Sequence, residues 1–398
     1  MLRQCFLLAL WLIAPLCFAA PVAAPAAQRD GLLPLVRYID RLGEQAITRG
    51  KLPGLAIGIV HQHQILHTRG YGVVEVGRKE AVDEHTAFRL ASLSKAFAAT
   101  VAAQLVQEGA LRWDSRVVDP LPTFQLKRSG AAEQLTLRDI LSHRVGVSFH
   151  AFDRELEADQ PYPLLAAKLV EAPSLCAPGE CYAYQNIAFS LVGDMVFAAT
   201  GDFFTHQVER RIFHPLEMYD TTYGRDSLEA SAKWARPHVR TRRGWVAVRP
   251  KENYYRVPPA AGVNASVSDM AKWLVAQTGG KPDVLSAELL HDLHQPQVRT
   301  PSEIRRSGWR QRIRDAHYAT GWRVLDYAGH EVIYHAGAVQ GYRGMIAMLP
   351  EKQFGIVVLW NAESAVPSGI AASALDHLLG LSSRDWTGLE KAPGGKRR

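Results

Sequence analysis

The chain has 398 residues, of which 47% are hydrophobic and 21% are charged. This balance is typical of a folded globular protein and excludes general disorder. The formal net charge is +7, but no zinc-finger, RNA-recognition or helix-turn-helix pattern accompanies it, so we expect a solvated basic surface and no nucleic-acid partner. The length suffices for two domains, or for one large α/β domain with an insertion.

The N-terminus has the order of segments found in secretory signal peptides. Arg3 precedes an apolar stretch from Cys5 to Phe18, and small residues follow at Ala19 and Ala20. The apolar stretch is shorter than the roughly 20 residues that span a bilayer. We therefore predict a signal peptide over residues 1–19, export across the inner membrane to the periplasm, and no stable membrane insertion after cleavage.

Signal cleavage would leave two of the four cysteines, Cys176 and Cys181, on either side of a Pro-Gly turn. In an oxidising compartment such a pair predicts a disulfide, and two free thiols are the alternative. Closing so short a loop contributes about 2 kcal/mol at most.

The first third of the chain alternates between helical and strand patterns. Residues 20–30 have low complexity and are predicted to form a linker, and residues 31–50 follow with the pattern of an amphipathic helix. Two β-rich runs, 54–64 and 65–76, predict adjacent antiparallel strands. A buried helix is expected from Leu93 to Gly109, since an apolar residue recurs there at every fourth position.

The remainder turns helical and loop-rich and then returns to strands. Clear helical patterns are residues 135–147, 185–201, 266–280 (with Ser266 or Ser268 as N-cap) and 366–380. Strand patterns are residues 319–329, 330–337, 342–350 and 352–361.

Strands at both ends of the chain predict one antiparallel sheet that is interrupted by a helical insertion. We assign residues 31–111 and 235–384 to an α/β sheet domain, residues 112–234 to a helical domain, and residues 385–398 to a disordered tail. The expected fold class is α/β (α+β), with helices flanking the sheet.

Ser92 and Lys95 stand at the start of the predicted buried helix and share one of its faces. A serine is a poor nucleophile until a base takes its proton, and a desolvated lysine can be that base. The helix N-terminus would also stabilise developing negative charge. Ser94 points elsewhere and is expected to be a structural hydroxyl. Alone the pattern is weak, because a serine at a helix start is usually a cap.

Two further motifs strengthen this interpretation. Tyr184 and Asn186 follow the presumed disulfide, and His335 and Gly337 end a predicted strand. A Ser-x-x-Lys, a Tyr-x-Asn and a His-x-Gly, in that order and about 90 and 150 residues apart, resemble the penicillin-recognising serine hydrolases. The resemblance is greatest to the class C β-lactamase group with its related D-alanyl peptidases and esterases, and it spans most of the chain after the signal peptide.

The resemblance implies a serine β-lactamase-like fold and assigns catalytic roles. Ser92 would be the acyl-accepting nucleophile and Lys95 would help to remove its proton. Tyr184, near two cations, would act as a phenolate base for Ser92 and later for water. The disulfide would hold the loop that positions this phenol.

The resemblance also assigns substrate contacts. Asn186 would hydrogen-bond the substrate amide, and Gly337 would let a strand backbone approach the substrate. The N–H groups of Ser92 and Ala338 would form an oxyanion hole.

The third motif departs from the β-lactamase pattern, because His335-Ala336-Gly337 replaces the usual Lys-Thr-Gly. A lysine would carry a permanent charge for a substrate carboxylate, whereas a histidine is cationic only part of the time near neutral pH. The His-x-Gly form resembles peptidases and esterases of the family, which puts efficient penicillin hydrolysis in doubt.

Other histidines and arginines have plainer interpretations. His61, His63 and His67 have the same parity, so on one strand they would face one way; a zinc site there is the alternative to an ordinary solvent-facing strand. His143 is expected to satisfy loop backbone groups. Two basic stretches, residues 299–314 and 239–251, are expected to be solvated loops, with attraction to acidic cell-wall or outer-membrane material as the alternative.

The sequence thus predicts an exported serine hydrolase that cleaves a β-lactam or related D-alanyl amide through an acyl-enzyme on Ser92. The alternatives on the same fold are a D-Ala peptidase or transpeptidase and a short-chain esterase. A non-catalytic penicillin-binding sensor and a metal-assisted hydrolase are rivals of another class. The partner is a small β-lactam or a cell-wall peptide, and the motifs require no cofactor.

Overall fold

A computed structural model of the protein describes residues 26–390. The predicted signal peptide, the first part of the predicted linker and residues 391–398 of the predicted tail lie outside the described residues.

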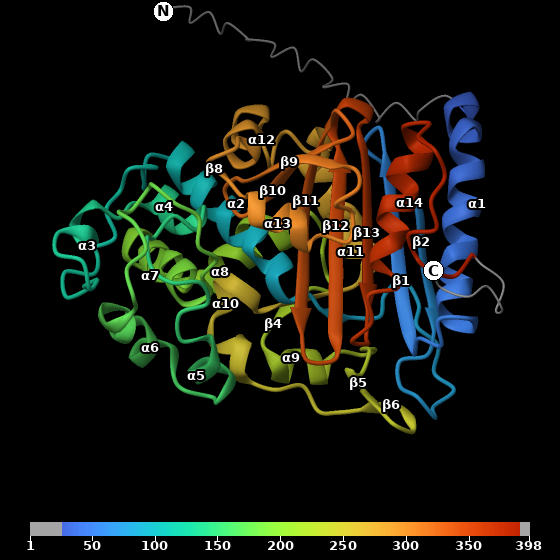
Figure 1. Cartoon of the computed structure of the whole chain (residues 1–398), viewed down its shortest axis with the longest axis horizontal. Helices are drawn as coiled ribbons and strands as arrows, with labels where there is room; N and C mark the ends of the chain where they lie inside the picture. The colour runs from blue at the N-terminus through green and yellow to red at the C-terminus, as the bar shows by residue number, and fades with distance from the viewer. Residues whose placement is uncertain (1–25, 391–398) are drawn as a thin grey trace, which may run out of the picture.

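The main sheet is antiparallel and is built from both ends of the chain, as the sequence predicts. Its eight strands follow the order β2-β1-β13-β12-β11-β10-β9-β8, so the last strands of the chain pair with the first (Figure 1). The strands are β1 (Gly54–His61), β2 (Gln64–Gly72), β8 (Val298–Arg299), β9 (Ile313–Tyr318), β10 (Arg323–Tyr327), β11 (His330–Val339), β12 (Tyr342–Leu349) and β13 (Phe354–Trp360).

Helices cover both faces of this sheet. On one face α1 (Ala26–Thr48) and α14 (Ser368–Leu378) pack together over the strands, and on the other face lie α2 (Ser94–Gln107) and α11 (Val267–Val275). This two-sided cover explains why all seven residues of β13 are buried and why it has no polar alternation.

The region predicted as helical, residues 112–234, gathers beside the sheet (Figure 1). Its helices are α3 (Ala131–Gln134), α4 (Leu137–Leu141), α5 (Asp153–Glu157), α6 (Tyr162–Lys168), α7 (Ile187–Thr200), α8 (Phe204–Val208) and α9 (Arg225–Ala230). Further short helices follow as α10 (Pro258–Ala261), α12 (Ala287–His294) and α13 (Pro301–Arg306). Two small sheets consist of β3 (Phe88–Arg89), β7 (Val263–Ala265) and β4 (Thr222–Tyr223), and of the hairpin β5 (His238–Thr241) and β6 (Gly244–Ala247).

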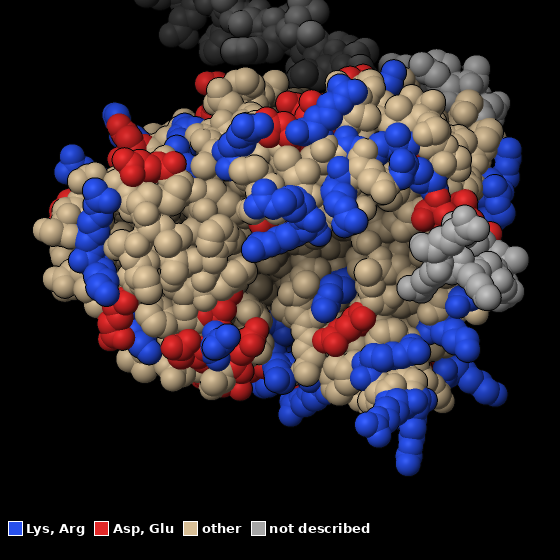
Figure 2. All heavy atoms as spheres, viewed as in Figure 1, with Lys and Arg blue, Asp and Glu red and all other residues tan. Residues whose placement is uncertain are grey.

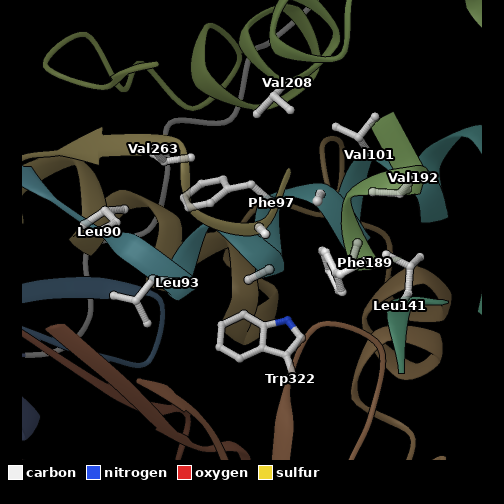
Figure 3. Close-up of a cluster of buried hydrophobic side chains, with 14 of the residues drawn as sticks. Leu90, Leu93, Phe97, Val101, Leu141, Phe189, Val192, Val208, Val263 and Trp322 are labelled. Atoms are coloured by element: carbon white, nitrogen blue, oxygen red, sulfur yellow. The ribbon is translucent and has the colours of Figure 1, made fainter. Parts of the chain in front are cut away.

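Helix α2 joins the main sheet and the helical region into one hydrophobic core. Leu93 and Phe97, predicted to be buried, have exposed fractions of 1% and 0%. Around them lie Phe189 from α7 and Trp322 from the loop before β10 (Figure 3). The helical region therefore has no separate core from the sheet, and the position of the α2 start is fixed from both sides.

Several boundaries differ from the prediction. Helix α1 begins at Ala26, inside the predicted linker 20–30. The prediction of a disordered tail from residue 385 is wrong for residues 385–390, since the Trp386 indole donates to Asp376 at 2.8 Å and Tyr38 donates to Glu390 at 2.8 Å.

The two basic stretches are also not simple loops. Residues 299–314 contain α13 and the start of β9, and residues 239–251 contain most of the β5–β6 hairpin. Most of their arginines are exposed, as edge strands and hairpins allow, and this hides the strand pattern in the sequence; Arg312 is the exception and pairs with the buried Asp376.

Candidate active site

Ser92 lies in a tight 3₁₀ turn, Ala91–Leu93, directly before α2. Ala91 has φ +51°, a left-handed conformation that is unfavourable for a residue with a Cβ. Ser94 stabilises the turn, because its hydroxyl donates to the Ala91 carbonyl at 2.7 Å and accepts the Val263 N–H at 3.0 Å. Ser94 is thus structural, as predicted, and the turn holds Ser92 in a fixed position at a partly exposed site.

Lys95 is completely buried next to Ser92. Its Nζ lies 3.4 Å from the Ser92 hydroxyl, and it donates to the Asn186 side-chain oxygen at 2.7 Å and to the Ala260 carbonyl at 3.0 Å. Burial lowers the pKa of Lys95 to about 7, with the Asp153 charge opposing and the Arg323 charge adding to this shift. A substantial fraction of Lys95 is therefore neutral near pH 7 and able to accept a proton.

Tyr184 faces Ser92 and Lys95. Its ring centroid lies 4.7 Å from the Lys95 Nζ. Burial raises the pKa of Tyr184 above its usual value, although a hydrogen bond with Ser92 and the Arg323 charge oppose this. The predicted phenolate is thus not favoured here: the phenol keeps its proton, and Lys95 is the better base of the two.

The loop that carries Tyr184 is fixed by His143. The backbone N–H of Ala183 donates to the His143 carbonyl at 2.9 Å, and the N–H of Gln185 donates to the His143 Nδ1 at 3.2 Å. The His143 and Tyr184 rings lie 4.2 Å apart between centroids. His143 therefore satisfies loop backbone groups, as predicted.

The predicted disulfide is present between Cys176 and Cys181. The short loop that it closes is tied to the chain after His143, because the N–H of Gly179 donates to the Arg144 carbonyl at 2.8 Å. The disulfide and His143 thus hold the same segment from two sides, and this segment positions the Tyr184 phenol.

Asn186 links Lys95 to a carboxylate that sequence reasoning missed. Its side-chain NH₂ donates to Asp153 Oδ2 at 2.8 Å, and the same oxygen accepts from His150 Nδ1 at 2.8 Å. The exposed fraction of Asp153 is 8%. No spacing in the sequence marks this residue, because α5 and the start of α7 meet only in the folded chain.

His335 is buried and uncharged. Tyr318 donates to its Nε2 at 3.0 Å, and its Nδ1–H donates to the Ala336 carbonyl at 2.9 Å. Burial, reinforced by the charges of Arg323 and Lys95, lowers the pKa of His335 well below its usual value. The histidine thus does not supply the charge that a lysine would supply in this motif.

Arg323, whose charge acts on His335, is another residue that sequence reasoning did not single out. Its guanidinium forms an ion pair with Glu303 at 3.3 Å and donates to the Tyr182 hydroxyl at 3.2 Å. Because its charge already has a carboxylate partner, Arg323 is a weaker anchor for a substrate carboxylate than an unpaired lysine.

Gly337 brings β11 against the nucleophile turn. A Cβ at this position would clash with the Leu90 carbonyl and lie 3.2 Å from the Ser92 backbone nitrogen. The close approach predicted for this glycine therefore exists, but its observed partner is the backbone before Ser92. It places the backbone of Ser92 beside that of β11.

A cavity of about 490 Å³ opens at this point. The predicted site residues that line it are Ser92, Tyr184, Asn186, His335, Gly337 and Ala338. Lys95 lies behind them in the protein interior. The structure thus brings the three sequence motifs together around one cavity.

The three histidines His61, His63 and His67 do not lie on a single strand. Gln62 and His63 have φ of +48° and +61° and make the turn between β1 and β2, so His61, His63 and His67 do not share one strand face. In the described part of the chain, no group of three or more His, Cys, Asp or Glu side chains is placed to hold a metal ion. The structure therefore does not bring these three histidines together on one strand face, as the zinc alternative assumed.

A serine on a strained turn, a buried lysine beside it and a tyrosine facing both define a serine-hydrolase type of site. Residues 37–381 match the family described as Beta-lactamase. The chain belongs to this family and is a serine hydrolase.

Curated relatives align with most of the chain. Unguisins hydrolase ungD of Aspergillus violaceofuscus is 26% identical over 391 residues, covering 89% of this chain and 67% of that protein. Protein flp of Staphylococcus aureus is 24% identical over 337 residues, covering 82% and 63%. The chain thus spans about two thirds of the length of these relatives.

Solved structures share the fold. The octameric penicillin-binding protein homologue from Pyrococcus abyssi superposes with a TM-score of 0.77 at 24% identity, covering 87% of this chain and 78% of that one. EstCE1, described as a hydrolase with promiscuous acyltransferase activity, gives a TM-score of 0.73 at 18% identity, covering 88% and 99%.

None of the helices in the described residues is by itself long and apolar enough to cross a bilayer; one bent pair, Ile187–Thr200 with Phe204–Phe213, has the length and composition to do so jointly.

Proposed function

We propose that the protein hydrolyses an ester or amide bond through a covalent acyl-enzyme on Ser92. The observation that carries this proposal is the contact of the Ser92 hydroxyl with Lys95, 3.4 Å away, whose pKa is lowered to about 7. A buried lysine of this kind can accept the serine proton at neutral pH.

In the proposed reaction, neutral Lys95 accepts the Ser92 proton as the oxygen attacks the substrate carbonyl. The backbone N–H groups of Ser92 and Ala338 stabilise the oxyanion. The Tyr184 phenol donates a proton to the leaving group and is reprotonated through Lys95. Water then attacks the acyl-enzyme and gives a proton to neutral Lys95. Lys95 passes this proton to the departing Ser92 oxygen, which releases the acid and restores the Ser92 hydroxyl.

A β-lactam or D-alanyl amide is the first candidate substrate class. The order of the three motifs supports it, as does the similarity in fold to penicillin-binding proteins. In this class Asn186 would contact the substrate amide through movement of its NH₂ away from Asp153.

A short-chain ester is the second candidate, and a specific observation favours it. Neither the neutral His335 nor the ion-paired Arg323 offers an unpaired cation to a substrate carboxylate at the third motif. The similarity in fold to EstCE1 agrees with this candidate.

Export to the periplasm is part of the proposal and rests on the N-terminal sequence. The exposed arginines of the β5–β6 hairpin, which form a group of Lys and Arg side chains in Figure 2, suit an environment with acidic cell-wall or membrane material. Raised salt would weaken such an attraction.

A substrate panel tests the function. Purified protein is assayed with penicillins and cephalosporins, D-Ala-D-Ala peptides and short-chain p-nitrophenyl esters, each alongside Ser92→Ala. We expect turnover of at least one class that Ser92→Ala abolishes and that EDTA leaves unchanged. Turnover that survives in Ser92→Ala, or that EDTA removes, would contradict the serine mechanism.

A further inference from the structure

The cavity at Ser92 continues around the edge of β11 to the opposite face of the sheet. Strand β10 pairs with β11 only as far as the Arg323–Tyr334 pair, and beyond that point β11 pairs with β12 alone among the described strands. The freed edge of β11 runs from His335 to Val339 and has three small residues, Ala336-Gly337-Ala338, at its centre. Strand pairing therefore does not close the cavity at this edge.

Residues from both faces of β11 line this one cavity. His335 and Gly337 face α2 and the nucleophile, whereas Tyr334 and Ala336 face α14, as alternation along a strand requires. Met345 lies directly opposite Ala336 on β12 and lines the cavity on the same face. The cavity thus has a polar part at Ser92 and a second part on the α14 side of the sheet.

The second part, which we call the apolar recess, has hydrophobic walls. The side chains that form it are Ile304, Trp309, Leu325, Tyr334, Ala336 and Met345. Trp309 fixes its outer wall, since the indole N–H donates to the Ser368 carbonyl at 3.1 Å and the ring lies 4.9 Å from the Tyr334 ring between centroids.

The charged residues at its mouth pair with one another. Glu303 lies 3.3 Å from Arg323 and 3.6 Å from Arg306, so one carboxylate serves two guanidinium groups. In Figure 2 the surface is hollowed beside the Lys and Arg side chains that lie over α13. These charged side chains line the same cavity but are already paired, so an uncharged group would enter the recess at the lowest desolvation cost.

We propose that the apolar recess binds an uncharged hydrophobic substituent of the substrate, either an aliphatic chain or a single aromatic ring, while the scissile carbonyl lies at Ser92. The inference rests on the proposed acyl transfer and narrows its substrate class. A substituent that passes the Ala336–Ala338 edge buries its methylene groups against Trp309 and Met345, and each buried methylene adds affinity.

Chain-length series test the recess. The kcat/KM is measured for p-nitrophenyl esters from acetate to octanoate and for acetate esters of ethanol to octanol. We expect kcat/KM to rise at least about tenfold between two and six carbons in one of the two series, the acyl or the alcohol series, because the added methylenes are buried.

Two variants change the size of the recess in opposite directions. Ala336→Leu fills it and should move the preferred chain length downward, whereas Met345→Ala enlarges it and should move the preference upward. Ala198→Leu makes the same chemical change on an exposed position of α7 and should leave the preference unchanged.

A binding measurement keeps the test independent of turnover and of the folding of any one variant. Calorimetry on Ser92→Ala compares N-hexanoyl with N-acetyl glycine methylamide, and the hexanoyl compound should bind at least about tenfold more tightly. Equal binding of the two, together with flat chain-length series, would overturn the inference. If hydrolysis depends on Ser92 but kcat/KM does not change with chain length, the proposed role of the recess is wrong and the proposed reaction stands. If the hexanoyl compound binds more tightly but Ser92 is never acylated, the role of the recess stands and the proposed reaction is wrong.

Discussion

The carboxylate of Asp153 determines the orientation of the Asn186 side-chain amide. An ionised carboxylate only accepts hydrogen bonds, so the Asn186 NH₂ must face Asp153 and the amide oxygen must face Lys95. This orientation holds the Lys95 Nζ beside Ser92. Asp153 also brings a negative charge close to the lysine, which raises its pKa against the effect of burial.

Replacing Asp153 by Asn should change the pH profile. Only neutral Lys95 accepts a proton, so kcat/KM rises as pH passes the Lys95 pKa of about 7. Removing the negative charge lowers this pKa, and the rise in kcat/KM should move to lower pH while its maximum falls by roughly 10- to 100-fold because the amide is misoriented.

The control is Asp194→Asn, which alters a half-buried aspartate on α7 that bonds Tyr162 away from the cavity. It should leave the pH midpoint unchanged. A fall in activity of Asp153→Asn without any movement of the midpoint would show that Asp153 is merely structural.

These residue-scale features were only partly predictable from the sequence. The spacing of Ser92 and Lys95 predicts a shared helix face, and the three motifs indicate the family. Asp153 and Arg323 act from segments that are distant in sequence and reach the site only through tertiary packing, so no periodicity or motif marks them. The charge states of Tyr184 and His335 depend on burial, which a sequence does not give.

At the scale of elements, the site depends on the contact between β11 and the turn that carries Ser92. The contact is possible because Gly337 has no Cβ, and it aligns the backbone of both segments for an oxyanion hole.

Gly337→Ala should break this contact. The added Cβ would meet the Leu90 carbonyl, which cannot move without displacing the nucleophile turn. We expect unfolding in urea to show a loss of about 1–3 kcal/mol and the Ser92-dependent activity to disappear. Gly31→Ala is the matched control, because a Cβ there meets nothing within 4 Å. Wild-type activity in Gly337→Ala would refute the role of the close approach.

The presence of helices and strands was easier to predict than the residues at which they begin and end. The apolar runs of β1 and β13 and the periodicity of α2 and α7 made these elements visible. Strand β9 was missed because its exposed face carries Arg314 and Asp315, as suits a strand near the sheet edge. The turn inside the histidine run was obscured because Gln62 and His63 adopt positive φ without the usual glycine.

At the scale of the whole molecule, the C-terminal segment closes the face of the sheet that α1 and α14 cover. Buried Asp376 on α14 accepts hydrogen bonds from Arg312 at 3.0 Å, Tyr327 at 2.8 Å and the Trp386 indole at 2.8 Å. Composition predicted disorder from residue 385, yet Trp386 brings the chain back to this carboxylate.

A chain that ends at Arg384 should therefore be less stable than one that ends at Glu390. It loses the Trp386 donor and leaves Asp376 with one partner fewer, which costs about 1–3 kcal/mol in the free energy of unfolding. Thermal and urea unfolding of the two truncated chains measure the difference. Equal stability would show that residues 385–390 do not contribute to the fold.

The central claim is the acyl-enzyme on Ser92, and covalent labelling tests it most directly. The protein is incubated with a fluorescent penicillin and, separately, with p-nitrophenyl esters, quenched in acid, and examined by intact mass and peptide mapping. The account predicts a single acyl adduct on the peptide that contains Ser92 and none in Ser92→Ala. An adduct that persists in Ser92→Ala, or acylation of another residue in the wild-type protein, would contradict it.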